Sequence, residues 1–189
     1  MAPAPNPHFP DRADSVLLLV DFQERLMKAM PEEPRARMLR NATILVQAAG
    51  RLGLPVLFSE QYPKGLGPTV QEILDLLPGA EPIEKMVFSC AGVERFRTVA
   101  EALGRRTFVL AGIENHVCVL QTALDLVEEG YAVFSARDAT CSRTRENWEA
   151  GNEVMARAGV TISSTEILVF QWLLTASAEE FKDISKLVR

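Results

Sequence analysis

One cysteine stands where a strand pattern gives way to a helix pattern. In the run Leu110-Ala-Gly-Ile-Glu-Asn-His-Val-Cys118-Val-Leu-Gln-Thr-Ala, the apolar strand breaks at Gly112 and helical spacing begins at Cys118. The N-terminus of a helix favours a thiolate, so we expect a nucleophile whose pKa lies below the ordinary value of about 8.5. The alternative is a small buried hydrophobe, the commoner role of a free cysteine. Cys90 and Cys141 lack this placement and are expected to be structural thiols.

An acid and a lysine stand at the ends of two further strand patterns. Asp21 follows residues 15–20, and Lys85 closes residues 82–85. An ammonium beside a thiol and a carboxylate favours the charged forms, which would suit nucleophilic catalysis by the three groups together. Taken singly, Asp21 could instead cap the turn that follows it, and Lys85 could be a solvated charge or pair with a nearby glutamate.

The elements that would position these residues alternate along the chain. Apolar runs of strand length are followed by runs with helical spacing, which implies right-handed crossovers and a parallel sheet covered on both faces. We therefore expect an α/β fold, a three-layer α/β/α sandwich with a six-stranded, mostly parallel, Rossmann-like sheet. The expected strands are residues 15–20, 55–59, 82–85, 107–111, 131–135 and 160–163, and the expected helices are residues 35–52, 70–77, 94–103, 118–129 and 167–174.

Ligands of such sheets bind beyond the carboxyl ends of the strands, where the strand order reverses. The expected sheet therefore brings Asp21, Lys85 and Cys118 to one edge. A dinucleotide is disfavoured there, because the first strand runs into Asp21-Phe-Gln-Glu instead of a glycine-rich turn that admits a pyrophosphate.

Composition narrows the partners and the compartment. A net charge of −5 over 189 residues, without a dense cluster of Lys and Arg, argues against nucleic acid and leaves a small molecule as the expected partner. Three cysteines without regular spacing, and no apolar stretch of signal or membrane type, indicate a reducing cytoplasm. We expect one domain, residues 14–189, behind a flexible arm, residues 1–13, that begins with a proline-rich stretch.

Three separated motifs resemble those of the isochorismatase-like cysteine hydrolases. They are the strand end Asp21-x-Gln23, Lys85 at a later strand end, and Gly112-Ile-Glu-Asn-His-Val-Cys118-Val with Thr122-Ala behind it. The resemblance spans residues 14–170. The segment Glu60-Gln-Tyr-Pro-Lys-Gly-Leu-Gly-Pro-Thr69 is similar to the subgroup of isochorismatase domain-containing proteins.

The resemblance implies a catalytic triad. Cys118 would be the nucleophile, Asp21 the base that takes its proton, and Lys85 the cation that holds both in an electropositive pocket. It also implies a cis peptide bond between Ile113 and Glu114, with the backbone N–H groups of Glu114 and Cys118 directed at the developing oxyanion.

The remaining candidate site residues are less constrained by the sequence. Nicotinamidase-type relatives hold zinc with several histidines, whereas this chain has only His8 and His116, so we expect no metal and no other cofactor. His116 lies two residues before Cys118 and is expected to line the pocket or cap the helix, with proton transfer as the alternative. Four further candidates for substrate contact fall just past strands one to three, where each could instead pack between loops: Gln23, Glu60, Tyr62 and Phe88.

These features predict a metal-independent cysteine hydrolase of a small molecule, cleaving an amide or ureido C–N bond through a thioester on Cys118. The alternatives are hydrolysis of an ester or vinyl ether, and a non-catalytic binding or regulatory protein on the same fold. The sequence does not identify the substrate, because specificity depends on individual pocket contacts.

An apolar run near the C-terminus bears on assembly. Residues 167–174 follow Ser163-Ser-Thr-Glu166, which resembles a capping box, and they carry Phe170 and Trp172. A helix that is apolar nearly all round needs cover on more than one side. Because the resembling family is also commonly oligomeric, we expect a homo-oligomer, at least a dimer.

Overall fold

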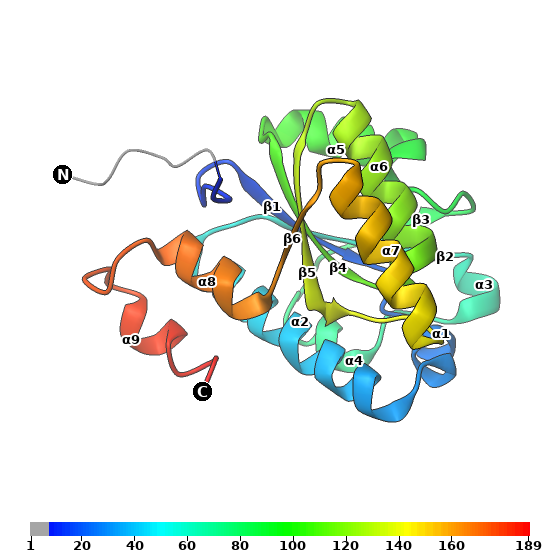
Figure 1. Ribbon diagram of the computed structural model, residues 1–189, viewed down its shortest axis with the longest axis horizontal. Coiled ribbons are helices and arrows are strands. Elements are labelled where there is room, and N and C mark those ends of the chain that lie inside the picture. The colour runs from blue at the N-terminus through cyan, green and yellow to red at the C-terminus, as the bar shows by residue number, and fades with distance from the viewer. Residues whose placement is uncertain (1–7) are drawn as a thin grey trace.

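The central strand, β1 (Ser15–Val20), is buried along its whole length, as its unbroken apolar sequence predicts. The computed structural model describes residues 8–189 (Figure 1). β1 pairs in parallel with β2 (Val56–Gln61) on one side and with β4 (Thr107–Gly112) on the other. The remaining strands, β3 (Ile83–Lys85), β5 (Ala132–Thr140) and β6 (Thr161–Ser163), complete a parallel sheet in the order β3-β2-β1-β4-β5-β6.

Helices cover both faces of this sheet (Figure 1). Leu17 and Leu19 of β1 share a core with α2 (Glu32–Leu52) and α8 (Thr165–Leu173). The alternate residues of β1 pack in a second core with α5 (Glu94–Leu103), α6 (Leu120–Glu128) and α7 (Arg145–Arg157). The predicted three-layer α/β/α fold with six strands is therefore confirmed. The shorter elements are α1 (Glu24–Ala29), α3 (Pro63–Leu66), α4 (Gln71–Leu74), α9 (Phe181–Ile184), the 3₁₀ turn η1 (Cys90–Gly92) and the π-helical turn η2 (Asn115–Val119).

The strand order reverses between β1 and β4. The chain adds β2 and β3 toward one edge, then returns to place β4 on the other side of β1 and continues outward to β6. The loops that leave β1 and β4 therefore diverge at the carboxyl ends of the strands, where sheets of this kind bind ligands. The register aligns Val20 with both Ser59 and Gly112, so the ends of β1, β2 and β4 lie together at this edge of the sheet.

Some elements differ in length from the expectation. β2 and β5 continue to Gln61 and Thr140, beyond the predicted ends at residues 59 and 135. The helix predicted over residues 70–77 is wrong in length, since α4 ends at Leu74 and only turns follow it. Pro78 accounts for the exclusion of Leu77 from the helix, because the residue before a proline is disfavoured in the helical conformation.

Two further differences concern helices. α7 is not among the predicted helices, because only Gly151, Asn152 and Met155 of its 13 residues are buried and the apolar periodicity is correspondingly weak. The capping residue of α8 is Ser164 rather than the predicted Ser163: its hydroxyl accepts the N–H of Ile167.

The N-terminal arm is described only in part. Residues 1–7 of the predicted arm lie outside the described residues. Farther along, Ser15 Oγ donates to the carbonyl of Asp11 at 2.6 Å, and Arg12 lies 3.4 Å from the carboxylate of Glu180 near the C-terminus. Within residues 8–189, no helix has both the length and the apolar character needed to cross a bilayer.

Candidate active site

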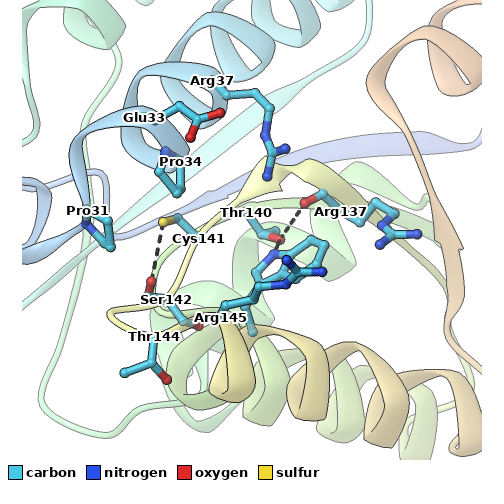
Figure 2. A pocket seen from close by; sticks show the side chains of 11 residues that line it. Pro31, Glu33, Pro34, Arg37, Arg137, Thr140, Cys141, Ser142, Thr144 and Arg145 are labelled. Atoms are coloured by element: carbon cyan, nitrogen blue, oxygen red, sulfur yellow. Dashed lines mark hydrogen bonds between the residues drawn. The ribbon is translucent and has the colours of Figure 1, made fainter.

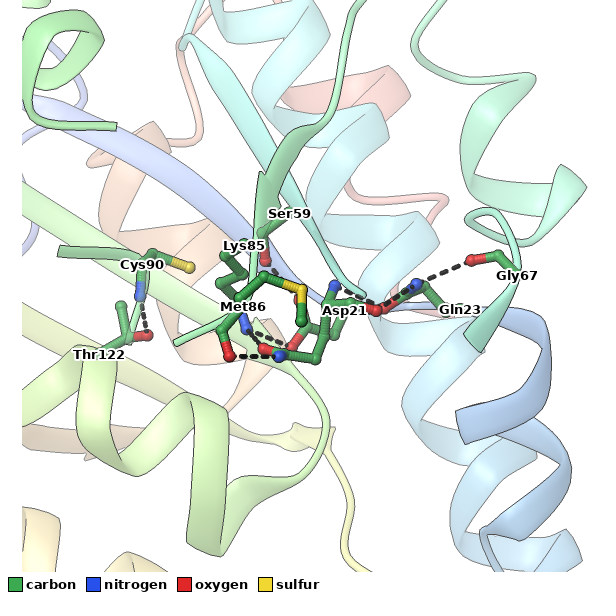
Figure 3. Close-up of polar contacts among 9 residues, drawn as sticks. Asp21, Gln23, Ser59, Gly67, Lys85, Met86, Cys90 and Thr122 are labelled. Carbon is green, nitrogen blue, oxygen red and sulfur yellow. Dashed lines mark hydrogen bonds and ion pairs between the residues drawn. The ribbon is translucent and has the colours of Figure 1, made fainter. Parts of the chain in front are cut away.

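The carboxylate of Asp21 lies just past the carboxyl end of β1. The residue follows the last position of β1 and adopts a left-handed backbone with φ of 54°, which Asp tolerates better than most side chains. Its Oδ1 accepts the hydroxyl of Ser59 at 2.7 Å, and its Oδ2 accepts Lys85 Nζ at 2.7 Å (Figure 3). The side chains of Asp21 and Lys85 are both 0% exposed. A charge buried this deeply requires a partner, and each supplies the other's.

Lys85 reaches this carboxylate from the edge strand β3, across the end of β2. Its ammonium donates to Asp21 and, at 2.8 Å, to Oε1 of Gln61. Burial by itself would lower the pKa of Lys85, but the charge of Asp21 and the neighbouring thiols more than offset it, so the pKa is raised above 10.5. Lys85 is therefore a permanent cation at neutral pH.

Cys118 completes the group, with a pKa that corrects the sequence-based expectation. The residue is 5% exposed and lies inside the π-helical turn η2, three residues after its start, rather than at the first position of an α-helix. Burial and the adjacent Asp21 carboxylate raise its pKa to about 12, although Lys85 acts in the opposite direction. The predicted lowering of this pKa is wrong, because desolvation of the thiolate outweighs the cation. The charges of Asp21 and Lys85 both lie close enough to the thiol to act on its ionisation.

The buried thiols predict that stability falls at alkaline pH. Burial raises the pKa of Cys90, Cys118 and Cys141 above 9.0, so the folded chain holds these protons more tightly than the unfolded chain. The thiols contribute their full stability at a pH below the pKa of an unfolded cysteine. That contribution is lost as the pH rises toward the higher pKa values of the thiols in the folded chain. We expect Cys118 alone to account for a loss of about 1 kcal/mol between about pH 9 and about pH 10, measured by urea unfolding. A Cys118→Ala variant should lose less stability over this interval, and identical losses would exclude the Cys118 thiol as a source.

The turn that carries Cys118 is held by close backbone packing. Gly112 has φ of 136°, and a Cβ there would collide with the carbonyl of Val20, so only glycine allows this approach of β4 to β1. The peptide bond between Ile113 and Glu114 is cis, as the resemblance implied. Asn115 then fixes the start of η2, because its N–H donates to the carbonyl of Cys141 at 2.8 Å.

Two of the predicted substrate contacts face inward. Both amide atoms of Gln23 are hydrogen-bonded: Oε1 accepts the N–H of Gln61 at 2.8 Å, and Nε2 donates to the carbonyls of Gln61 and Gly67. Glu60 Oε1 accepts both the N–H and the hydroxyl of Thr69, at 2.7 and 2.8 Å. These bonds tie the loop after β2 to the ends of β1 and β2. A substrate contact for Gln23 or Glu60 stays a prediction.

The other predicted contacts lie nearer the surface. Tyr62 and Phe88 are about half exposed, with Met86 and Val87 beside Phe88 in the loop that leaves β3. The Tyr62 N–H donates to the carbonyl of Lys85 at 2.9 Å, which joins the loops after β2 and β3. His116 Nδ1 lies 3.0 Å from Ser142 Oγ, an arrangement suited to a wall residue.

Three residues of the polar network were not predicted from the sequence: Ser59, Gln61 and Cys90. The N–H of Cys90 donates to Thr122 Oγ1 at 2.9 Å (Figure 3), and the charges of Lys85 and Asp21 act on the ionisation of its thiol. The same rule that singled out Asp21 and Lys85 applies to Ser59 and Gln61, since both lie at the carboxyl end of β2. The rule missed Gln61 because β2 was predicted to end before this residue.

A separate cavity of about 540 Å³ opens beyond β5, between the N-terminal parts of α2 and α7 (Figure 2). Asp21, Lys85 and Cys118 do not line it. It shares a wall with the turn that carries the thiol, through Cys141 and Ser142. The lining residues are Pro31, Glu33, Pro34, Arg37, Arg137, Thr140, Cys141, Ser142, Thr144, Arg145 and Trp148. Within the described part of the chain, no group of three or more His, Cys, Asp or Glu side chains is arranged to hold a metal ion.

Sequence relatives extend over nearly the whole chain. The isochorismatase domain matches residues 15–167. Isochorismatase domain-containing protein 1 of Danio rerio is 38% identical over 177 residues, which cover 94% of this chain and 62% of that protein; the chain therefore spans less than two thirds of that relative. Isochorismatase domain-containing protein 2 of Xenopus laevis is 34% identical over 177 residues, covering 92% of this chain and 83% of that protein.

Solved structures agree with these matches. The MAR1 ribonuclease of Caenorhabditis elegans superposes with a TM-score of 0.89 at 30% identity, over 95% of this chain and 92% of that chain. The YcaC gene product of Escherichia coli, described as an octameric hydrolase of unknown specificity, has a TM-score of 0.90 at 23% identity, over 97% of this chain and 91% of that chain, and shows the fold alone. Because the domain matches residues 15–167 and the sequence relatives exceed 30% identity, the chain belongs to the isochorismatase family, among the isochorismatase domain-containing proteins.

Proposed function

We propose that this chain is a hydrolase of a small molecule, with Cys118 as the nucleophile that cleaves an amide or ureido C–N bond. The observation that carries this proposal is the buried Asp21–Lys85 ion pair of 2.7 Å, whose two charges act on the ionisation of the Cys118 thiol. Burying an ion pair costs desolvation free energy. A fully buried pair at a strand end therefore favours a role in which its charges act on a neighbouring group. Membership of a family of hydrolases supports the same reading.

The geometry suits a transfer of the Cys118 proton to Asp21 that takes place as the substrate approaches. At rest, the raised pKa keeps Cys118 a thiol beside the Asp21 carboxylate. As a carbonyl carbon approaches, Asp21 takes the thiol proton, and the sulfur attacks while the Lys85 cation offsets the charge that develops on it. The oxyanion would meet the backbone N–H groups of Glu114 and Cys118. Asp21 then returns the proton to the departing nitrogen, and water hydrolyses the thioester to release the acid and the free thiol.

The same groups would serve an ester or a vinyl ether, and a non-catalytic binding protein would need no turnover at all. A similar solved structure is named a ribonuclease, which makes RNA a further candidate. The net charge of −5 disfavours RNA, since phosphate binding depends on clustered cations.

The three cysteines are free thiols, which supports the reducing cytoplasm as the proposed compartment.

A substrate screen tests the proposed reaction directly. Small primary amides and ureido compounds are incubated with the protein, ammonia release is measured, and intact-protein mass spectrometry looks for an acyl adduct on Cys118. Single-stranded RNA and a panel of esters run beside them. Ammonia release with a transient adduct on Cys118 is the expected result. Cleavage of RNA alone, or of nothing in the panel, would contradict the proposal.

Chelation tests the proposed independence of metal ions. The activity found in the screen should survive dialysis against EDTA within about twofold, because each catalytic group is a side chain or backbone amide and none needs a metal to become reactive. Loss of activity with EDTA and its return on addition of zinc would contradict this expectation.

We also propose a homo-oligomer that uses the outer face of α8. Trp172 is fully buried in the core of its own chain, whereas Ile167, Phe170 and Leu174 are 52%, 38% and 45% exposed. A similar fold is described as octameric. Light scattering coupled to size exclusion should give a multiple of 20.9 kDa at micromolar concentration, and Phe170→Glu should lower the mass. A wild-type mass of one chain would rule the oligomer out.

A further inference from the structure

Gln61 lies between the two charged residues of the site. It is the last residue of β2 and pairs in register with Lys85 on β3, while β1 lies on its other side. Its side-chain Oε1 accepts Lys85 Nζ at 2.8 Å, and its Nε2 donates to the carbonyl of Met86 at 2.9 Å (Figure 3). The two bonds fix the orientation of the amide, because a flipped amide would set an NH₂ group against the ammonium.

The backbone of Gln61 is also fixed. β1 turns out of the sheet at Asp21, so no main chain continues beside the end of β2. The side chain of Gln23 takes that place: it accepts the N–H of Gln61 at 2.8 Å and donates to its carbonyl at 3.0 Å. The amide that holds Lys85 is thus anchored on both flanks and is nearly buried.

The hydrogen bonds of Lys85 show what this anchoring achieves. An ammonium has three N–H donors. One is directed to Asp21 and one to Gln61, which leaves the third available to the nearby Cys118 sulfur, on whose ionisation Lys85 acts. Because the amide is neutral, Asp21 and Lys85 keep the site at zero net charge. The charge stays zero when the proton moves from Cys118 to Asp21, since the thiolate then pairs with the same ammonium.

We propose that Gln61 is a positioning residue, which aims the Lys85 ammonium at Cys118 and does so without adding charge to the site. This inference rests on the proposed role of Cys118 as the nucleophile. It does not require the substrate to be known, because the reactivity of the Cys118 thiol can be measured directly.

The test compares two variants of Gln61 that differ in charge. Gln61→Met removes both side-chain hydrogen bonds. Gln61→Glu keeps the shape and the contact with Lys85, but it loses the bond to the Met86 carbonyl and adds a negative charge. The rate of iodoacetamide alkylation at Cys118 is followed by mass spectrometry at about pH 8.5, and stability by urea unfolding. Gln61→Glu should alkylate about tenfold or more slowly than wild type, because a buried like charge raises a thiol pKa by a unit or more. Gln121→Glu, an exposed residue on α6, controls for the added charge.

The ranking of the two variants decides the matter. Gln61→Met should be the less stable and Gln61→Glu the less reactive, so stability and reactivity rank in opposite orders. If Gln61 only braces the strand ends, both properties will fall further in Gln61→Met, and that result overturns the proposal. Should either variant fail to fold, Gln61→Asn, which keeps an amide too short to reach Lys85, must slow alkylation while circular dichroism shows that it is folded; wild-type alkylation would overturn the proposal. A wild-type Cys118 that never reacts would count against the proposed function instead.

Discussion

Replacing Cys118 with Ala should lower the rate of substrate hydrolysis by a factor on the order of 10⁴ or more, with little effect on the fold. The variant removes the only atom proposed to bond to substrate, and what remains is oxyanion stabilisation and binding. Asp21→Asn should cost a comparable factor, because the amide cannot take the thiol proton. Steady-state kinetics on the best substrate of the screen measure both losses.

The double variant provides a sharper check. If Cys118 and Asp21 act as a unit, the two losses will not add, and Cys118→Ala with Asp21→Asn will be no slower than the worse single variant. Cys141→Ala is the matched control, since it removes an equally buried thiol that does not contact Asp21 or Lys85. Activity within a few-fold of wild type in Cys118→Ala would exclude the proposed nucleophile.

The convergence of Asp21, Lys85 and Cys118 could be predicted from sequence because it depends on topology alone. Each residue stands at the end of a predicted strand or in the loop that follows one, and parallel strands place their carboxyl ends at one edge. Knowledge of the side-chain packing is not needed for that step. The same reasoning predicted the six strands and the three layers, whose apolar periodicities are strong.

The ionisation of Cys118 could not be predicted in the same way. A helix N-terminus and a nearby lysine both favour the thiolate, and both are visible in the sequence. Depth of burial is not, and here desolvation together with the Asp21 carboxylate raises the pKa to about 12. The direction of the pKa shift is decided by how deeply the folded chain buries the sulfur, and that depth depends on the whole fold.

Polar residues at the site show a second limit of the sequence. Gln23 and Glu60 stand where a substrate contact is reasonable, yet their side chains bind backbone groups of Gln61 and Thr69. A polar side chain at a strand end serves equally well as a ligand contact or as a partner for unpaired backbone, and the choice depends on where β1 leaves the sheet. Gln61 is the opposite case. It was not among the predicted site residues, yet β2 extends beyond its predicted end and the Gln61 amide accepts a hydrogen bond from Lys85.

Replacing Lys85 with Met should lower the free energy of unfolding by about 3–5 kcal/mol, the usual cost of breaking a buried ion pair. The variant leaves the Asp21 carboxylate at 0% exposure with the Ser59 hydroxyl as its remaining side-chain donor. Restoring neutrality should recover most of the loss, so Asp21→Asn combined with Lys85→Met should be more stable than Lys85→Met alone. Urea unfolding followed by circular dichroism measures all three proteins.

Arg95→Met is the matched control for this prediction. Arg95 and Glu81 form an ion pair of the same 2.7 Å length, but their side chains are 53% and 77% exposed. Because solvent screens an exposed pair, its loss should cost less than about 1 kcal/mol. The contrast between the variants isolates burial, since both remove one cation from a pair of equal length. If Lys85→Met costs no more than Arg95→Met, or if the double variant recovers nothing, Asp21 does not carry an uncompensated charge in the folded protein, and the base proposed for Cys118 would have to be sought elsewhere.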